Sequence, residues 1–234
     1  MNPVARSAVH HLYGKHGARL TAVNGWEVPA AFAGAAAEAA AARAGAGLWD
    51  LSAQTKWEIV GAGAQAALAA LLGGSAPDVG RATSGTVSGE RMLALRLADD
   101  RALILGPPGV PLEAALRASL PTGCAHLLNV TSGLCGIRLG GPSARAILAA
   151  LTALDVSPQA WPDLACAEGG LAHVHAILLR RDMAGLPAFE VYAGRNYGAY
   201  LWEAFMDAGR GRGLAPCGLE AERLLVASTV ADPH

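Results

Sequence analysis

Apolar and polar positions along this chain follow two periods, which together predict an alternation of strands and helices. Residues 56–60 and 171–180 alternate polar with apolar side chains, as half-buried strands do, whereas residues 197–208 carry apolar side chains at helical spacing. Similar patterns, bounded by glycine and proline, predict strands at 92–97, 102–105, 127–131, 134–139 and 189–193, and helices at 35–45, 65–72, 111–120, 144–151 and 220–226. Residues 47–52 are expected to turn into an extended piece, and residues 84–89 to form a polar turn.

A strand, a glycine-rich turn and a helix follow one another twice. Gly61 and Gly63 come after the strand at 56–60, and Gly140 and Gly141 come after the strand at 134–139. This self-similarity indicates a duplicated α+β unit with mostly antiparallel strands and packed helices. The expected halves cover about residues 20–124 and 125–228, and no polar linker separates them, so residues 1–234 are expected to form one domain.

The composition predicts a large core that is rich in alanine. Apolar residues make up 53% of the 234 residues and aromatic residues only 5%, so small side chains fill much of the core. The net charge is −1 without a basic block, and no nucleic-acid partner is expected. Neither a secretory signal nor an uncharged apolar run of about 18 residues is present, which predicts a cytoplasmic protein without a membrane span.

The cysteine and histidine residues are not spaced as the ligands of a metal site. The four cysteines, Cys124, Cys135, Cys166 and Cys217, form no CxxC pair, which favours reduced, buried thiols over a zinc site. His173 and His175 would share one face of the strand at 171–180, but no third ligand accompanies them. Asp50 is expected to cap a turn or the N-terminus of a helix. The sequence therefore predicts no metal site.

Three groups of short motifs occur in order along the chain. The first is GWEVP at 25–29, GLWDLS at 47–52 and KWEIVG at 56–61; the second is IRLGGPSA at 137–144; the third is FEVY at 189–192, LWEA at 201–204 and PCGL at 216–219. Together they resemble the glycine cleavage T-protein (aminomethyltransferase) superfamily. Residues 128–208 are more similar still to the γ subunit of heterotetrameric sarcosine oxidase, through NVTS at 129–132, LDV at 154–156 and FEVYAGRNY at 189–197. The resemblance implies a T-protein-like α+β folate-binding fold. Full T-proteins add a C-terminal barrel domain, which the length of 234 residues leads us to expect is lacking here.

A central folate channel is also implied by the resemblance, with Glu190 as its main contact. A carboxylate can accept the adjacent N–H and amino groups of a pterin ring together, and Glu190 matches the family glutamate that does so. Phe189 and Val191 would face the other side of their strand, which leaves Glu190 free to line a cavity. The alternative is a solvent-facing residue on a half-buried strand. By the same resemblance, further folate contacts are assigned to Gln54, Arg180, Tyr192 and Trp202.

The residues expected at the reacting centre depart from the family. T-proteins place an Asp pair before the strand that leads into LADDR at 97–101, and the matching positions here are Glu90 and Arg91. Glu90 is the candidate catalytic acid or base, although Arg91 beside it would weaken it as a base. The family motif SHMG is replaced by SAQT at 52–55, a glutamate is missing from AGLP at 184–187, and an arginine is missing from 224–228.

Three functions fit this pattern. The first is a tetrahydrofolate-binding subunit, similar to the sarcosine oxidase γ chain, in a complex whose flavin-containing oxidase subunits oxidise an N-methyl amine. The second is a stand-alone tetrahydrofolate-dependent aminomethyl- or methyltransferase that uses Glu90 and a lipoyl carrier protein or a small donor. The third is a non-catalytic scaffold that has lost folate binding. The chain length and the replaced Asp favour the first.

Overall fold

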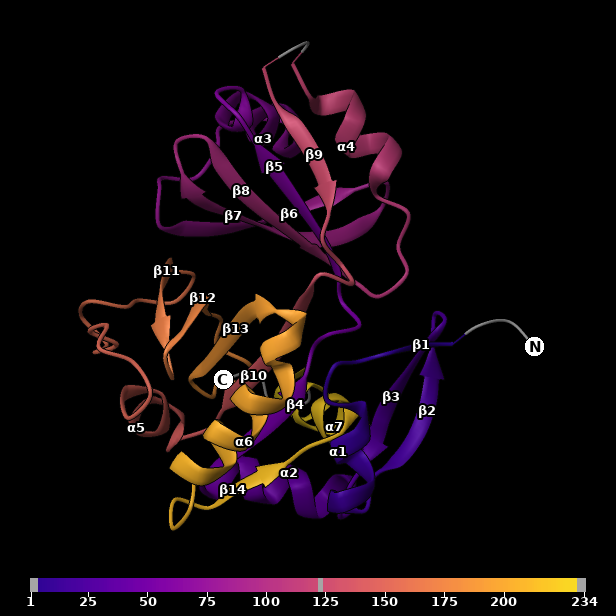
Figure 1. The fold of residues 1–234 in the computed structure, drawn as a ribbon, viewed down its shortest axis with the longest axis vertical. Helices are drawn as coiled ribbons and strands as arrows, with labels where there is room; N and C mark the ends of the chain where they lie inside the picture. Colours follow the sequence, from indigo (N-terminus) through magenta and orange to yellow (C-terminus); the bar gives the residue numbers. More distant parts are fainter. Residues whose placement is uncertain (1–3, 122–123, 231–234) are drawn as a thin grey trace.

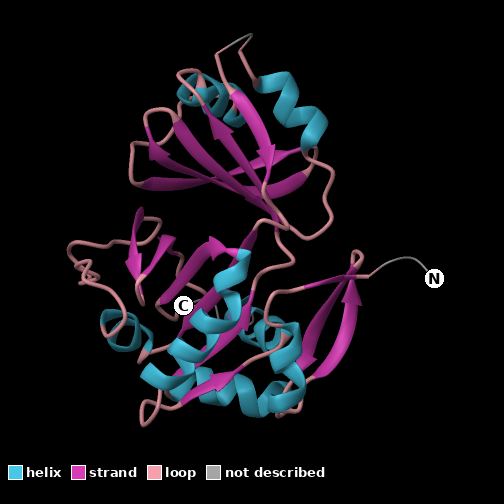
Figure 2. Cartoon of the chain, in the orientation of Figure 1, coloured by secondary structure: helices cyan, strands magenta, loops and turns pink. Residues whose placement is uncertain are grey.

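Two β-sheets packed against one another form the centre of the molecule, and helices cover their outer faces (Figure 1). The structure is a computed structural model that describes residues 4–121 and 124–230. A small third sheet stands beside the larger of the two (Figure 2). The mixed architecture with mostly antiparallel strands confirms the predicted α+β class.

The smaller central sheet has five antiparallel strands in the order β6-β7-β8-β5-β9. They are β5 (Thr55–Val60), β6 (Arg81–Val87), β7 (Glu90–Ala98), β8 (Arg101–Gly106) and β9 (His126–Asn129). Helices α3 (Ala64–Leu72) and α4 (Glu113–Ser119) pack on the face that carries Trp57, Ile59 and Ile104. This body is the upper one in Figure 1.

The larger central sheet has six strands in the order β11-β12-β13-β10-β4-β14, and only β4 and β14 run parallel. They are β4 (Ala46–Asp50), β10 (Leu134–Gly140), β11 (Cys166–Leu171), β12 (Val174–Arg180), β13 (Ala188–Gly194) and β14 (Leu214–Pro216). Helices α5 (Ala144–Ala149) and α6 (Gly198–Ala208), the latter preceded by the 3-10 turn η2 (Arg195–Tyr197), pack on the face that carries Ile137, Phe189 and Val191.

The remaining elements lie beside the six-stranded sheet, in the lower body of Figure 1. β1 (Ala5–Arg6), β3 (Trp26–Ala31) and β2 (Arg19–Val23) form the third sheet, beside α1 (His10–Tyr13) and η1 (Gly14–His16). Helices α2 (Ala35–Ala44) and α7 (Leu219–Val230) pack against each other, and α7 also contacts β3.

Alternation along the strands explains how the two central sheets meet. In β7, Met92 and Ala94 point to the helices of their own body, whereas Leu93 and Leu95 join a cluster with Ile177, Leu179 and Tyr192 of the other sheet. Strand β7 is therefore buried on both faces over residues 92–95.

The predicted duplication appears as two strand–glycine–helix units. Gly61 after β5 has φ 128° and Gly141 after β10 has φ 129°, both in the region that favours glycine. A Cβ at Gly141 would lie 2.4 Å from the Ala42 carbonyl oxygen, and a Cβ at Gly61 would lie 2.6 Å from the Cys124 carbonyl oxygen. At both positions the backbone needs glycine to turn and to pack closely.

Several local predictions were wrong. Residues 84–87 belong to strand β6, and only Ser88 and Gly89 form the turn that was expected over 84–89. Residues 171–180 are not one strand, because Ala172 and His173 adopt positive φ and close the β11–β12 hairpin, so His173 and His175 do not share a strand face. Cys124 is exposed rather than buried. In the described residues, no group of three or more His, Cys, Asp or Glu side chains suits a metal ion.

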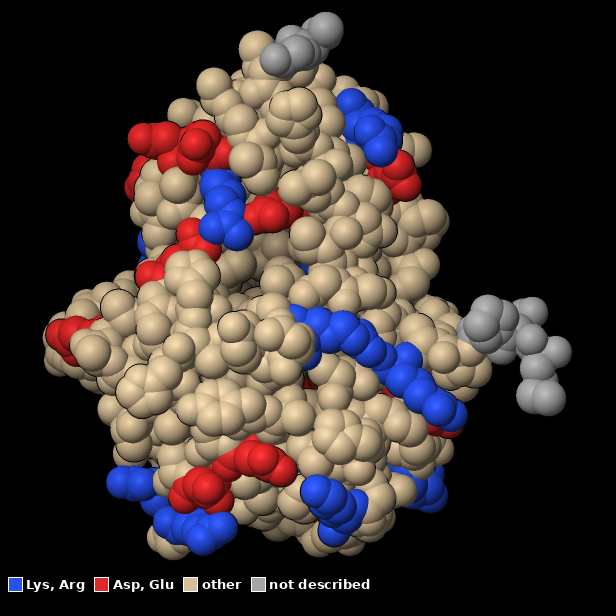
Figure 3. All heavy atoms as spheres, viewed as in Figure 1, with Lys and Arg blue, Asp and Glu red and all other residues tan. Residues whose placement is uncertain are grey.

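Charges of both signs are interspersed on the face seen in Figure 3, and most of that face is uncharged. This agrees with the net charge of −1. Within residues 4–121 and 124–230, no helix combines the length and the hydropathy needed to cross a bilayer.

Candidate ligand-binding site

Glu190 lies at the centre of a buried cluster of charged side chains between the two sheets. The register of β13 against β10 places Glu190 directly opposite Arg138, so their side chains leave the sheet on the same face. Tyr192, two residues further along β13, projects from that face as well. The Glu190 side chain is 0% exposed, which rules out the solvent-facing alternative.

Both carboxylate oxygens of Glu190 already have partners within the protein. Oε1 accepts from Arg138 Nε at 3.1 Å and Nη2 at 2.7 Å, and Oε2 accepts from the Tyr192 hydroxyl at 2.6 Å. Arg181 Nη1 lies 3.5 Å from Oε1. Burial alone would raise the pKa of Glu190, but Arg138, Arg181 and Tyr192 together lower it. Burial and the neighbouring Glu190 raise the pKa of Tyr192, so the phenol remains a donor.

Arg138 joins a second carboxylate to this cluster. Its Nη1 donates to Glu222 Oε1 on helix α7 at 2.5 Å and to Met183 Sδ at 3.4 Å. The Arg138 side chain is 6% exposed and that of Glu222 is 27% exposed. Tyr192, Glu190, Arg138 and Glu222 thus form a chain of hydrogen bonds that runs from the buried sheet interface to the surface of a cavity.

A cavity of about 520 Å³, here called the apolar chamber, lies between the third sheet, β4 and α7. Its walls include Val28, Pro29, Trp49, Leu51, Leu219 and Val226. Cys217 also lines it, and burial raises the pKa of this thiol to about 12, so the wall is uncharged there.

A second cavity of about 300 Å³, here called the arginine mouth, lies between the five-stranded sheet and α7. Arg91, Arg138 and Arg181 line it. Gln54, Pro108 and Glu222 line both cavities, so the apolar chamber and the arginine mouth adjoin one another at these residues. A ligand that spans them would have one apolar part and one anionic part.

Residues 51–54, where the chain passes from β4 to β5, hold Gln54 at this junction. Asp50 Oδ1 accepts from Ser52 N at 2.8 Å, which confirms the expected turn cap, and Asp50 Oδ2 accepts from the Tyr13 hydroxyl. The buried Lys56 ammonium donates to the Ser52 carbonyl at 2.8 Å and to the Gln54 carbonyl at 2.7 Å. Burial lowers the pKa of Lys56 to about 8. The Gln54 side-chain oxygen lies 2.7 Å from the Tyr192 hydroxyl.

The other residues expected to be functional lie elsewhere. Glu90 is exposed at the start of β7 and lines neither cavity, whereas its neighbour Arg91 lines the arginine mouth. Arg180 pairs with Asp182 at 2.8 Å and donates to the Trp161 carbonyl at 2.8 Å. The structure therefore gathers Glu190, Tyr192 and Gln54, but does not place Glu90 or Arg180 with them.

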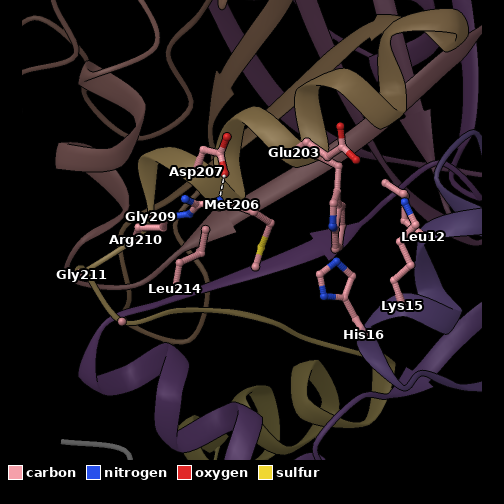
Figure 4. Close-up of a pocket in the computed structure, with 12 residues that line it drawn as sticks. Leu12, Lys15, His16, Glu203, Met206, Asp207, Gly209, Arg210, Gly211 and Leu214 are labelled. Atoms are coloured by element: carbon pink, nitrogen blue, oxygen red, sulfur yellow. Dashed lines mark ion pairs between the residues drawn. The ribbon is translucent and has the colours of Figure 1, made fainter.

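Trp202 lines a different pocket, of about 610 Å³, between α6 and the segment around η1 (Figure 4). His16 and Lys15 approach from one side of this pocket, and Met206 and Asp207 approach from α6. It shares no lining residue with the apolar chamber or the arginine mouth. The folate contact predicted for Trp202 would thus require a site apart from Glu190.

Sequence reasoning missed Arg138, Arg181, Glu222 and Lys56. Arg138 belongs to the IRLGGPSA motif and Lys56 to the KWEIVG motif, but neither motif assigned a role to these side chains. Arg138 and Glu222 are 84 residues apart, so their pairing depends on how α7 packs against α2 and β3. A charged residue inside an otherwise apolar strand, as at position 138, was the one available signal.

Comparison with known proteins shows which family carries a site of this kind. The GCVT N-terminal domain model matches residues 9–227. Aminomethyltransferases of Anoxybacillus flavithermus and Bacillus subtilis are each 29% identical over 94% of this chain, which spans 63% of their length. The glycine cleavage system aminomethyltransferase T of Bartonella henselae superposes with a TM-score of 0.80 at 22% identity, over 95% of this chain and 62% of that one. A chain of the heterotetrameric sarcosine oxidase of Corynebacterium sp. U-96 superposes with a TM-score of 0.67 at 22% sequence identity. This match covers 90% of the present chain and 97% of the oxidase chain. The resemblance seen in the motifs is thereby confirmed.

Proposed function

Because this chain belongs to the GCVT N-terminal domain family, we propose that it binds a tetrahydrofolate-type cofactor across the apolar chamber and the arginine mouth. We further propose that it does so as a subunit of an amine-oxidising or aminomethyl-transfer complex of one-carbon metabolism. The observation that carries the proposal is the junction of an apolar cavity with one lined by three arginines.

The residues present suit such a cofactor. Tetrahydrofolate has a reduced pterin whose pyrimidine half is flat, an aromatic linker and a glutamate tail with two carboxylates. Trp49, Leu51 and Pro29 offer apolar walls for the ring and the linker, and volumes of about 520 and 300 Å³ lie in the range of small-molecule sites. Arg91 and Arg181 can each bind a carboxylate through paired N–H groups.

The cofactor would supply nitrogen atoms that accept a one-carbon unit. The part of this chain is to bind and orient it, to exclude water and to hold protons nearby. In this proposal Gln54 and Glu222, which line both cavities, would meet the ring. Glu90 remains the predicted acid or base, although in this structure it is exposed at the β6–β7 hairpin.

A complex is supported by the match to 97% of a chain from a heterotetrameric oxidase. Flavin-containing oxidase subunits would deliver the one-carbon unit in that arrangement, and a lipoyl carrier protein would deliver it in the aminomethyl-transfer alternative. Native mass spectrometry of the protein taken from its source cells tests this part. A defined assembly with a flavoprotein supports it, whereas a monomer that turns over a methyl donor alone would favour the stand-alone transferase.

Calorimetric titration with tetrahydrofolate under anaerobic conditions tests the binding proposal. Saturable binding of one equivalent is expected, and Arg91→Gln should weaken it at low ionic strength. Arg117→Gln is the matched control, because Arg117 is exposed on α4, pairs with Glu113 and lines neither cavity. A wild-type protein that gives no binding heat and no fluorescence change would overturn the proposal and leave the scaffold alternative.

A further inference from the structure

We infer that Glu222, rather than Glu190, is the carboxylate that accepts the N–H groups of the ligand ring, and that Glu190 acts by holding Arg138 and so Glu222 in place. This inference rests on the proposed function, since it assumes that a tetrahydrofolate-type ring occupies the apolar chamber. It assigns a direct contact to α7 and a positioning role to β13.

Glu190 is not available to a ligand in this arrangement. Three N–H or O–H groups, two from Arg138 and one from Tyr192, already donate to its oxygens at 2.6–3.1 Å. Its side chain is 0% exposed, and it is not among the residues that line the apolar chamber or the arginine mouth. A ring that reached Glu190 would have to displace Arg138 and leave a buried guanidinium without its main partner.

Glu222 has the opposite properties. It lines both cavities, and its side chain is 27% exposed. Oε1 accepts from Arg138 Nη1 at 2.5 Å, while among the described residues no donor lies within hydrogen-bond distance of Oε2. A carboxylate has about four acceptor positions, so Glu222 keeps capacity for a neighbouring pair of ligand donors.

Arg138 fixes the direction in which Glu222 points. Four hydrogen bonds leave its guanidinium, two to Glu190, one to Glu222 and one to Met183 Sδ. The planar fork is therefore oriented on its buried side by Glu190 before it meets Glu222 on its cavity side. Tyr192 holds the other oxygen of Glu190 at 2.6 Å and prevents that carboxylate from rotating.

The ligand class follows from the groups around the chamber. A carboxylate beside the Gln54 amide suits a heterocycle that presents an N–H and an amino group side by side, as the flat pyrimidine half of the pterin does. The apolar walls would shield one side of this contact from water and so strengthen it. The anionic tail would then extend toward Arg91 and Arg181, away from Glu222.

Two ligands and three variants test the inference. The ligands are tetrahydrofolate and p-aminobenzoyl-glutamate, which has the tail but not the ring, and binding is followed by calorimetry and by tryptophan fluorescence, since Trp49 lines the chamber. Glu222→Gln keeps the shape and removes the charge, Glu190→Gln does the same at the positioning residue, and Glu220→Gln is the control on the same helix, where Glu220 pairs with Arg19.

Glu222→Gln is expected to lower the affinity for tetrahydrofolate at least about tenfold, because a charge-assisted hydrogen bond is lost, and to leave p-aminobenzoyl-glutamate binding unchanged. Glu190→Gln should weaken tetrahydrofolate binding less and lower the melting temperature more. Glu222→Asp, which keeps the charge, should restore part of the affinity and also serves if Glu222→Gln does not fold.

The inference is overturned if folded Glu222→Gln binds tetrahydrofolate like wild type while Glu190→Gln loses it. If the wild-type protein binds neither ligand, the proposed function itself fails, so the two failures are distinguishable. Wild-type binding of p-aminobenzoyl-glutamate as tight as that of tetrahydrofolate would also overturn the inference, because the ring would then contribute nothing.

Discussion

Replacing Arg138 by methionine tests the buried ion pair between the two sheets. The substitution leaves the Glu190 carboxylate, 0% exposed, with Arg181 Nη1 at 3.5 Å as its nearest cation. Removing one partner of a buried pair costs about 3–5 kcal/mol. For a chain of this length, 1 kcal/mol corresponds to about 2–4 °C in melting temperature, so Arg138→Met should lower it by roughly 6–20 °C.

The second arm of a double-mutant cycle is Glu190→Leu. Alone it should cost less than Arg138→Met, because Arg138 keeps Glu222 as a partner at 2.5 Å. The double variant replaces the pair with apolar side chains beside Met183 and should be close to wild type, as other buried pairs are when both partners are replaced. Unfolding by urea at neutral pH, followed by circular dichroism, gives the four free energies. Strictly additive costs would refute a direct interaction between the two side chains.

The pH dependence of the same pair has a definite sign. The pKa of Glu190 in the folded protein lies below its ordinary value of 4.5, so its contribution to stability is fully present above pH 4.5 and is lost as the pH falls through the folded-state pKa. The stability difference between wild type and Glu190→Gln should therefore be constant from pH 5 to 7 and shrink in more acidic buffer. A difference that grows on acidification would contradict the assigned ion pair.

Three further predictions concern other parts of the chain. Burial lowers the pKa of Lys56 from 10.5 to about 8, so folding releases a proton between these pH values. The free energy of unfolding of wild type should therefore rise by on the order of 3 kcal/mol relative to that of Lys56→Met as the pH rises across this window. Parallel plots of unfolding free energy against pH for the two proteins would contradict this. Gly141→Ala should lower the free energy of unfolding in urea by more than about 3 kcal/mol, because its Cβ would lie 2.4 Å from the Ala42 carbonyl oxygen. Gly73→Ala is the control, with open space around it, and should cost about 1 kcal/mol. Equal costs for the two variants would show that the close packing at Gly141 is unimportant. Glu90→Gln should leave tetrahydrofolate affinity unchanged, and a fall in turnover of about 100-fold would support its predicted acid or base role, while unchanged turnover would exclude it.

Most of the regular elements could be predicted because their own residues carry the pattern. The strands at β5, β7, β8, β10 and β13 and the helices α2, α3 and α6 match their expected positions to within a few residues. The strand expected at 171–180 begins too early, at the last residue of β11, because the turn Ala172–His173 contains neither glycine, proline nor asparagine, although both residues adopt positive φ. The rest of β11 was not predicted. Strand β6 was missed because its exposed Thr and Ser side chains are those of a polar turn.

The site could be predicted only in part, because its contacts join distant segments. The resemblance to T-proteins led to Glu190, and alternation along β13 correctly suggested that it leaves the sheet opposite Phe189 and Val191. Its partner Arg138 lies 52 residues away, and only the register of β10 against β13 brings the two together. Glu222 depends further on helix α7 packing over the cavity. Long-range pairing of this kind leaves no periodic trace in a single sequence.

The passage of the chain between sheets also has a consequence for how the protein folds during synthesis. All five strands of the smaller central sheet come from the contiguous segment 55–129, so this body can assemble while later residues are still on the ribosome. Strand β4, which precedes that segment, must wait for β10 and finally for β14 to emerge before both of its edges are paired. Until then it presents a short apolar edge, and a chaperone or an early partner protein that shields residues 46–50 would raise the folding yield.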